Sequence, residues 1–226
     1  MNIWLISVIG ILLIWIVIFV LRKGLRKEMV WASLITFPLA FTEPLFVPEY
    51  WNPPSLFNLA TTTGFDIESF VFTFSIGGIA SVLYEFFTNK EKHKKISIKQ
   101  RHKEIGVFHK IALMSPIVSF LIFVFYLDIN VIYLAILSMV IGIILLLLCR
   151  PDLKTKVITG GILFLVFYFF LFLVINLISP EFVKDVWTLN ELLGIFVLGV
   201  PIEELLFAFC VGMLWSGYYE HVKHLK

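Results

Sequence analysis

Long, unbroken hydrophobic stretches separated by short polar segments dominate the chain. They do not alternate apolar and polar positions as half-buried strands would, and most reach the roughly 20 residues that a helix needs to cross a bilayer. The predicted spans are residues 3–21, 29–47, 66–87, 107–127, 130–149, 157–178 and 192–217. The predicted fold class is therefore all-α: a polytopic membrane helical bundle with about seven transmembrane helices.

Composition supports this class, because 60% of the 226 residues are hydrophobic, more than a soluble domain of this length needs. Residues 3–21 carry no charge, follow no basic segment and precede no small-residue cleavage site. We therefore expect a retained first helix and not a signal peptide.

The basic residues predict the orientation. Clusters of Lys and Arg follow the first, third, fifth and seventh stretches, whereas Lys184 stands alone on the other side. The expected location is the cell membrane, multi-pass, with the N-terminus outside and the C-terminus cytoplasmic. The basic loop "NKEKHKKISIKQRHKE" (89–104) then contacts anionic membrane lipid, and no nucleic-acid partner is expected.

Two segments from different parts of the chain are similar in sequence to each other. Residues 64–85 align without gaps on residues 199–220, and "PLFVPEYW" at 44–51 matches "PEFVKDVW" at 180–187. This predicts two parallel three-helix repeats joined by a linker helix. The expected domains are 1–88 (first repeat), 89–129 (basic cytoplasmic loop and linker transmembrane helix) and 130–226 (second repeat). Paired repeats often form a ligand site at their interface.

Acidic residues inside the hydrophobic stretches are the candidate catalytic groups. Glu203 would lie roughly 16 Å into the seventh stretch at 1.5 Å per residue, near the middle of the ~30 Å hydrocarbon core. Pro201 would kink that helix at the site, and Glu204 would face about 100° away from Glu203. Burial favours a neutral carboxyl, which can protonate a substrate. The alternative is a buried acid that only fixes packing. The candidates are Glu203, Glu204, Glu68, Glu43 and Asp66.

Four phenylalanines recur beside the acid in both repeats, at Phe72, Phe74, Phe207 and Phe209. Aromatic faces attract cations, so these rings and Pro201 are candidates for binding a substrate that becomes a carbocation. Ordinary helix packing is the alternative for any one of them.

Other chemistries find little support in the sequence. The two cysteines, Cys149 and Cys210, are expected as free thiols and predict neither a disulfide framework nor a metal site. All five histidines fall on the predicted cytoplasmic side, and no H-E-x-x-H, G-x-S-G or phosphate-binding glycine motif is present. No cofactor is expected.

"PIEELLF" at 201–207, "PEYW" at 48–51 and the parallel repeats resemble the integral-membrane lycopene cyclases. The resemblance implies an isomerase that cyclises the linear ends of lycopene, or of a related carotenoid, without a redox cofactor. It maps Glu203 and Glu204 onto the family's P-x-E-E acids and Glu68 onto the first-repeat copy. There the chain departs from the motif, with Asp66 in place of the proline and Ser69 in place of the second acid.

Two alternatives remain open. One is a CAAX-type intramembrane protease-like protein, whose motif would need an arginine where Ala208 stands. The other is a non-enzymatic membrane carrier or binder of a polyene. Expected partners are a lycopene-like polyene and membrane lipid, and association into a homo-oligomer is left open.

Overall fold

The computed structural model describes residues 2–89 and 107–225, and the fold is almost entirely helical. The predicted basic loop therefore lies largely outside the described residues. The long helices are α1 (Ile3–Leu21), α2 (Arg26–Thr36), α5 (Ile67–Thr88), α7 (Val107–Tyr126), α8 (Val131–Cys149), α9 (Lys154–Ile178) and α11 (Ile202–Lys223). The short helices are η1 (Lys23–Leu25), η2 (Phe37–Thr42), α3 (Glu43–Phe46), η3 (Leu56–Asn58), α4 (Leu59–Thr63), η4 (Pro151–Leu153), α10 (Phe182–Val186) and η5 (Leu189–Glu191). Two short strands, β1 (Phe196–Val197) and β2 (Val200–Pro201), pair antiparallel.

Six helical segments within the described residues are long and apolar enough to cross a membrane. They are Ile3–Leu21, Lys23–Phe46, Ile67–Thr88, Phe108–Tyr126, Val131–Cys149 and Pro151–Ile178. Each overlaps one of the first six predicted spans, and the protein is a multi-pass membrane protein. A count of seven stays a prediction, because α11 is not among these six.

The predicted start of the seventh span, residue 192, was wrong. Residues 192–195 are an irregular segment after η5, residues 196–201 form the β1–β2 hairpin, and α11 begins only at Ile202. Leu198 and Gly199 both have positive φ, at 50° and 80°, as the turn of a tight two-residue hairpin requires. Pro201 is the N-cap of α11 and does not kink it.

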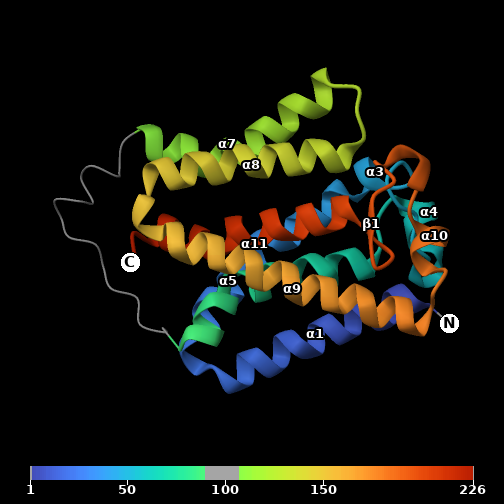
Figure 1. The fold of residues 1–226 in the computed structure, drawn as a ribbon, viewed down its shortest axis with the longest axis horizontal. Coiled ribbons are helices and arrows are strands. Elements are labelled where there is room, and N and C mark those ends of the chain that lie inside the picture. The colour runs from blue at the N-terminus through green and yellow to red at the C-terminus, as the bar shows by residue number, and fades with distance from the viewer. Residues whose placement is uncertain (1, 90–106, 226) are drawn as a thin grey trace.

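The long helices run side by side, with the N- and C-termini at opposite ends of the bundle (Figure 1). α11 packs mainly on α9, and also on α8 and α5, while α7 packs on α8 and α1 and α2 pack on α5. Contacts of α5 with α9 and α11 join the two halves of the chain. The helix that carries the P-I-E-E motif therefore lies in the middle of the bundle.

Close approach of α9 and α11 depends on small residues. A Cβ atom on Gly160 would lie 2.4 Å from the Ser216 Cβ, and one on Gly212 would lie 2.5 Å from the Phe164 Cβ. Such distances are impossible, so glycine is what lets these helix backbones meet.

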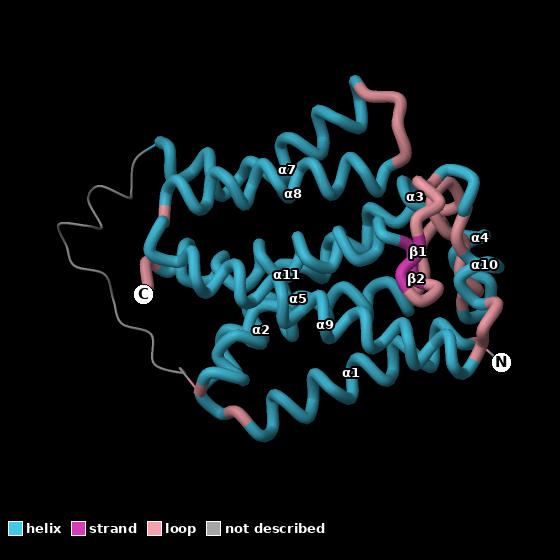
Figure 2. Tube along the Cα trace, in the orientation of Figure 1, coloured by secondary structure: helices cyan, strands magenta, loops and turns pink. Residues whose placement is uncertain are grey.

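The short elements α3, α4, α10 and β1–β2 gather at the end of the bundle that holds the N-terminus (Figure 2). Here the segment after α3 meets the segment after α10 through an antiparallel bridge between Trp51 and Trp187. The Asn52 amide donates to the Val186 carbonyl at 2.7 Å, and the Thr188 amide donates to the Tyr50 carbonyl at 3.0 Å. The two halves are thus joined at the end where α5 and α11 begin.

Candidate active site

The acids predicted as catalytic lie at the starts of helices, not halfway along them. Glu203 and Glu204 are in the first turn of α11, Glu68 is in the first turn of α5, and Asp66 is the N-cap of α5. The expectation that Glu203 lies deep in the middle of its helix was wrong, because residues 192–201 are not helical. The acids are nevertheless buried, since the hairpin and short helices cover this end of the bundle.

Glu203 is fully buried, and only one of its two carboxylate oxygens has hydrogen-bond partners among the described residues. Its Oε1 accepts hydrogen bonds from the Tyr133 hydroxyl and from the Leu193 amide, each at 2.8 Å. Its Oε2 is buried and has no hydrogen-bond partner among the described residues. One oxygen is therefore held in place while the other is available for a proton.

Glu204 faces a different set of partners, as its position one residue along the helix predicts. Its Oε1 accepts from the Tyr50 hydroxyl and, at 2.9 Å, from the Trp187 Nε1. Its Oε2 accepts from the Tyr168 hydroxyl at 2.9 Å. The carboxyl group is buried and acts as an acceptor at both oxygens, so it is held rigidly between the two halves of the chain.

Aromatic rings surround Glu204. Besides its three aromatic donors, Phe172 packs edge-to-face on Trp187 with ring centroids 5.5 Å apart, and Tyr168 lies 5.1 Å from Phe172. Tyr50 follows α3 outside the membrane-spanning segments. Burial, with the negative charge of Glu204 beside it, raises the pKa of Tyr50 well above its ordinary value. Tyr50 therefore remains a protonated donor.

Glu68 is arranged much as Glu203 is. It is fully buried, and its Oε1 accepts from the Leu56 amide at 2.8 Å and from the Asn2 side chain at 3.3 Å. Its Oε2 is buried without a hydrogen-bond partner among the described residues. Glu68 and Glu203 thus share one pattern, in which a backbone amide that precedes the acid's own helix and a side chain at the start of another long helix fix one oxygen.

Glu43 and Asp66 form a separate group at the start of α5. Glu43 Oε2 accepts from the Asp66 amide at 3.1 Å, and Glu43 Oε1 accepts from the Ser69 hydroxyl at 2.9 Å. Asp66 Oδ1 accepts from the Ser69 amide at 2.5 Å, which caps the helix. These contacts favour a structural part for Glu43 and Asp66.

The predicted substrate-binding phenylalanines have packing partners. Phe72 lies against Trp4 and Phe74 against Trp15, each with ring centroids 5.2 Å apart, so both fill the α1–α5 contact. Phe209 would contact a side chain on Gly161 of α9, and Phe207 is half-buried. The rings around the acid pair come instead from Tyr50, Tyr133, Tyr168 and Trp187.

A pocket of about 420 Å³ opens at the same end of the molecule. It is lined by Ile3, by residues between Asn52 and Thr61, and by residues between Ser179 and Val186, so both halves contribute. Its wall includes Pro54, whose carbonyl accepts from the same Asn2 side chain that donates to Glu68. The pocket therefore lies near Glu68, and none of the five candidate acids lines it.

The sequence did not reveal the donors to the acid pair. Trp187 and Tyr50 fall within the "PEFVKDVW" and "PLFVPEYW" match, which is the one signal that could have drawn attention to them. Tyr133 and Tyr168 stand alone in hydrophobic helices, and only the fold brings them to Glu203 and Glu204.

The fold and site define a multi-pass helical membrane protein with acids buried under a cap of short elements. Residues 130–222 match the family model described as lycopene cyclase, and this match supports an assignment to the lycopene cyclase family. The match spans α8 to α11 and contains Glu203 and Glu204. Comparisons with curated proteins and with solved structures gave no match.

Proposed function

We propose that the protein is a membrane isomerase that cyclises the linear ends of lycopene, or of a related carotenoid, by acid catalysis through a carbocation. The observation that carries the proposal is the buried acid pair Glu203–Glu204, enclosed by aromatic side chains within the segment that matches lycopene cyclases. An acid in dry surroundings can transfer a proton to an alkene without competition from water.

Glu203 is the proposed proton donor. Its Oε2 has no partner among the described residues, whereas Tyr133 and Leu193 hold its Oε1 in place. In the proposed reaction the proton adds to the terminal double bond of the polyene, and the next double bond attacks the cation and closes a six-membered ring. Loss of a ring proton to a carboxylate restores the double bond. The product is an isomer of the substrate, so no oxidant or reductant is required.

Glu204 and its aromatic partners are the proposed cation-stabilising group. The rings of Tyr50, Tyr168 and Trp187 converge on its carboxyl group, and aromatic faces stabilise a nearby positive charge. Because hydrogen bonds fix both Glu204 oxygens, its position changes little as charge develops.

We also propose that residues 1–88 and 130–226 are two copies of one three-helix unit, with 89–129 as the connection. The helix ends support this proposal. Asn2 and Asn130 each cap the first long helix of their half with a side-chain oxygen. Arg22 and Arg150 each end that helix, and each is followed by a three-residue 3₁₀ turn.

The helix contacts give further support. The repeat partners Gly64 and Gly199 both have positive φ, 81° and 80°. Gly77 of α5 lies against Thr36 of α2, and its partner Gly212 of α11 lies against Phe164 of α9. If the halves are copies, Glu68 corresponds to Glu203 and a second proton donor exists at the other half.

Expression in a lycopene-accumulating bacterium, with chromatography of the pigments, tests the function. The wild type is expected to form cyclic carotenoids. Glu203→Gln keeps the shape of the side chain but cannot deliver its proton, so the rate of cyclisation should fall by a factor of about 10²–10⁴ and chromatography should show a near-total loss of rings. Comparing Glu204→Gln and Glu68→Gln shows whether those acids share the task.

Glu181→Gln is the matched control, because Glu181 is an exposed acid that pairs with Lys184. It should cyclise as the wild type does, and membrane levels of all variants are compared by immunoblot. A wild type that leaves lycopene linear would refute the function, and full activity of Glu203→Gln would refute its role as donor.

A further inference from the structure

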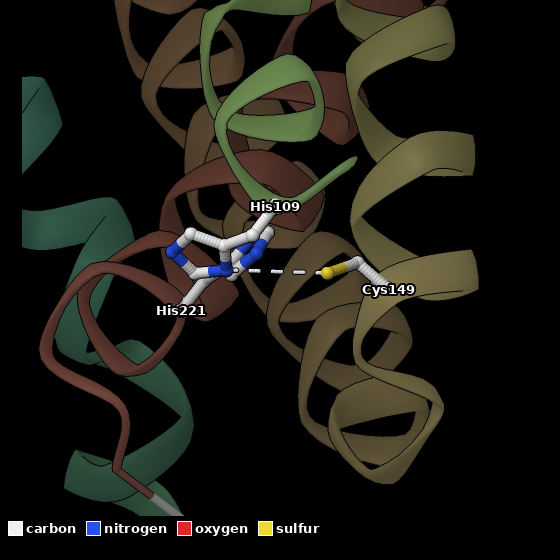
Figure 3. A group of neighbouring side chains, drawn as sticks. All are labelled: His109, Cys149 and His221. Atoms are coloured by element: carbon white, nitrogen blue, oxygen red, sulfur yellow. Dashed lines mark hydrogen bonds between the residues drawn. The ribbon is translucent and has the colours of Figure 1, made fainter. Parts of the chain in front are cut away.

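Three side chains with metal-binding atoms meet near the end of α11, whereas Glu203 and Glu204 are at its start. Figure 3 shows these three side chains beside one another. They are His109 at the start of α7, Cys149 at the end of α8 and His221 near the end of α11. One ligand atom from each lies within 4.8 Å of the others, and His109 Nδ1 is 4.0 Å from Cys149 Sγ. The sequence predicts no metal site here, since these residues are far apart along the chain.

His221 supplies a second, independent observation. Its side chain is fully buried, yet neither ring nitrogen has a hydrogen-bond partner among the described residues. A buried imidazole normally has a partner for its N–H and another for its unprotonated nitrogen. The His109 ring packs edge-to-face on it at 4.4 Å, which brings a second imidazole to the same place without satisfying either nitrogen.

We propose that His109, Cys149 and His221 bind a divalent transition-metal ion of the zinc class. Thiolate and imidazole are the ligands that Zn²⁺ takes in proteins, and three of them leave a fourth tetrahedral position open. Ligand atoms around Zn²⁺ lie roughly 3.3–3.7 Å apart, given bonds of about 2.0–2.3 Å. To bind the ion, the three ligand atoms would have to approach that range from the spacing of up to 4.8 Å seen here.

The fourth ligand of the ion would be a water molecule or His224, whose ring stacks on His109 with ring centroids 4.8 Å apart. The ion would join the start of α7 to the ends of α8 and α11, and so fix the helix that connects the two halves. Its distance from the acid pair is large, because 17 residues of α11 correspond to roughly 26 Å. The site is therefore structural, and the inference does not rest on the proposed cyclase activity.

Cobalt binding tests the site directly. The full chain is purified in detergent without a polyhistidine tag, stripped of metal with a chelator and titrated with Co²⁺. One Co²⁺ per chain should bind, with the visible absorption of tetrahedral cobalt and a thiolate-to-cobalt charge-transfer band in the near ultraviolet. Added Zn²⁺ should remove both signals, and Zn²⁺ should raise the Tm of the metal-free protein.

The two cysteines of the chain provide a matched pair of variants. Cys149→Ser should lose the charge-transfer band, whereas Cys210→Ser should keep it, because Cys210 lies elsewhere on α11. Loss of a residue that only hydrogen-bonds to a metal ligand typically weakens metal binding by about 10- to 100-fold. His221→Gln removes a proposed ligand itself, so it should weaken Co²⁺ binding by more than that. The site is refuted if the wild type shows no charge-transfer band, whatever the variants do, or if the band survives in Cys149→Ser.

Discussion

At the scale of single residues, Glu203 and Glu204 are neighbours in sequence with different surroundings. Glu203 has one hydrogen-bonded oxygen and one without a partner among the described residues, while both oxygens of Glu204 accept from aromatic donors. The helix makes this division, because successive side chains point about 100° apart. One acid can therefore give up a proton while the other stays fixed in its hydrogen bonds.

Two substitutions of Glu204 distinguish the part played by its hydrogen bonds from the part played by its charge: leucine removes both, whereas glutamine removes only the charge. Glu204→Leu would leave the buried donors of Tyr50, Tyr168 and Trp187 unpaired, at about 1–3 kcal/mol for each. Glu204→Gln should cost far less, because its carbonyl oxygen can accept from Tyr50 and Trp187 while Tyr168 accepts from the amide. Thermal unfolding in detergent measures the difference, and equal Tm values for the two variants would contradict these assignments.

At the scale of elements, a buried charge cluster joins four helices near the C-terminal end of α11. Lys156 of α9 lies 2.5 Å from Glu220 of α11 and 3.6 Å from Glu28 of α2, and it also pairs with Glu85 of α5. Glu85 and Glu220 occupy matching positions in the alignment of residues 64–85 on residues 199–220. A single ammonium group therefore sits between carboxylates from both halves of the chain.

Lys156→Met should destabilise the bundle strongly, because it leaves buried carboxylates without their cation. Removing one partner of a buried ion pair costs about 3–5 kcal/mol. Lys184→Met is the control: it breaks the exposed pair with Glu181, for which about 0–1 kcal/mol is typical. Chemical unfolding in detergent compares them, and similar stabilities would show that the cluster does not hold the helices together.

At the scale of the whole molecule, the two ends of the bundle differ in chemistry. The acids and the pocket lie at the end where α5 and α11 begin, whereas the charge cluster and the histidines lie towards the end where α11 stops. The basic residues of the sequence predict that the second end faces the cytoplasm. In that predicted orientation the proposed active site would lie towards the outer side of the membrane.

Labelling with a membrane-impermeant maleimide tests this orientation. Glu181→Cys, at an exposed position before α10, should react in intact cells. Lys223→Cys, at the exposed end of α11, should react only after the membrane is permeabilised. The unmodified chain sets the background from its own cysteines. The reverse pattern would invert the proposed topology.

The sequence by itself determined the membrane class, the position of six spans and the acid motif. Hydropathy is a local property, and a helix in lipid satisfies its own backbone, so these elements need no partner to be recognised. The sequence also contains a signal for the hairpin, because Gly194, Gly199 and Pro201 fall within eight residues and interrupt the last hydrophobic stretch.

Only the tertiary structure decided which side chains surround the acids. Residues 195–202 are as apolar as a membrane-spanning helix. The Ile202 amide nevertheless donates to the Ile195 carbonyl, and the segment folds back as a hairpin. Tyr133 and Tyr168 reach Glu203 and Glu204 from other helices, and His109 reaches His221 across the bundle. Such contacts join residues that are distant in the chain, so they depend on how the helices pack and not on any local pattern.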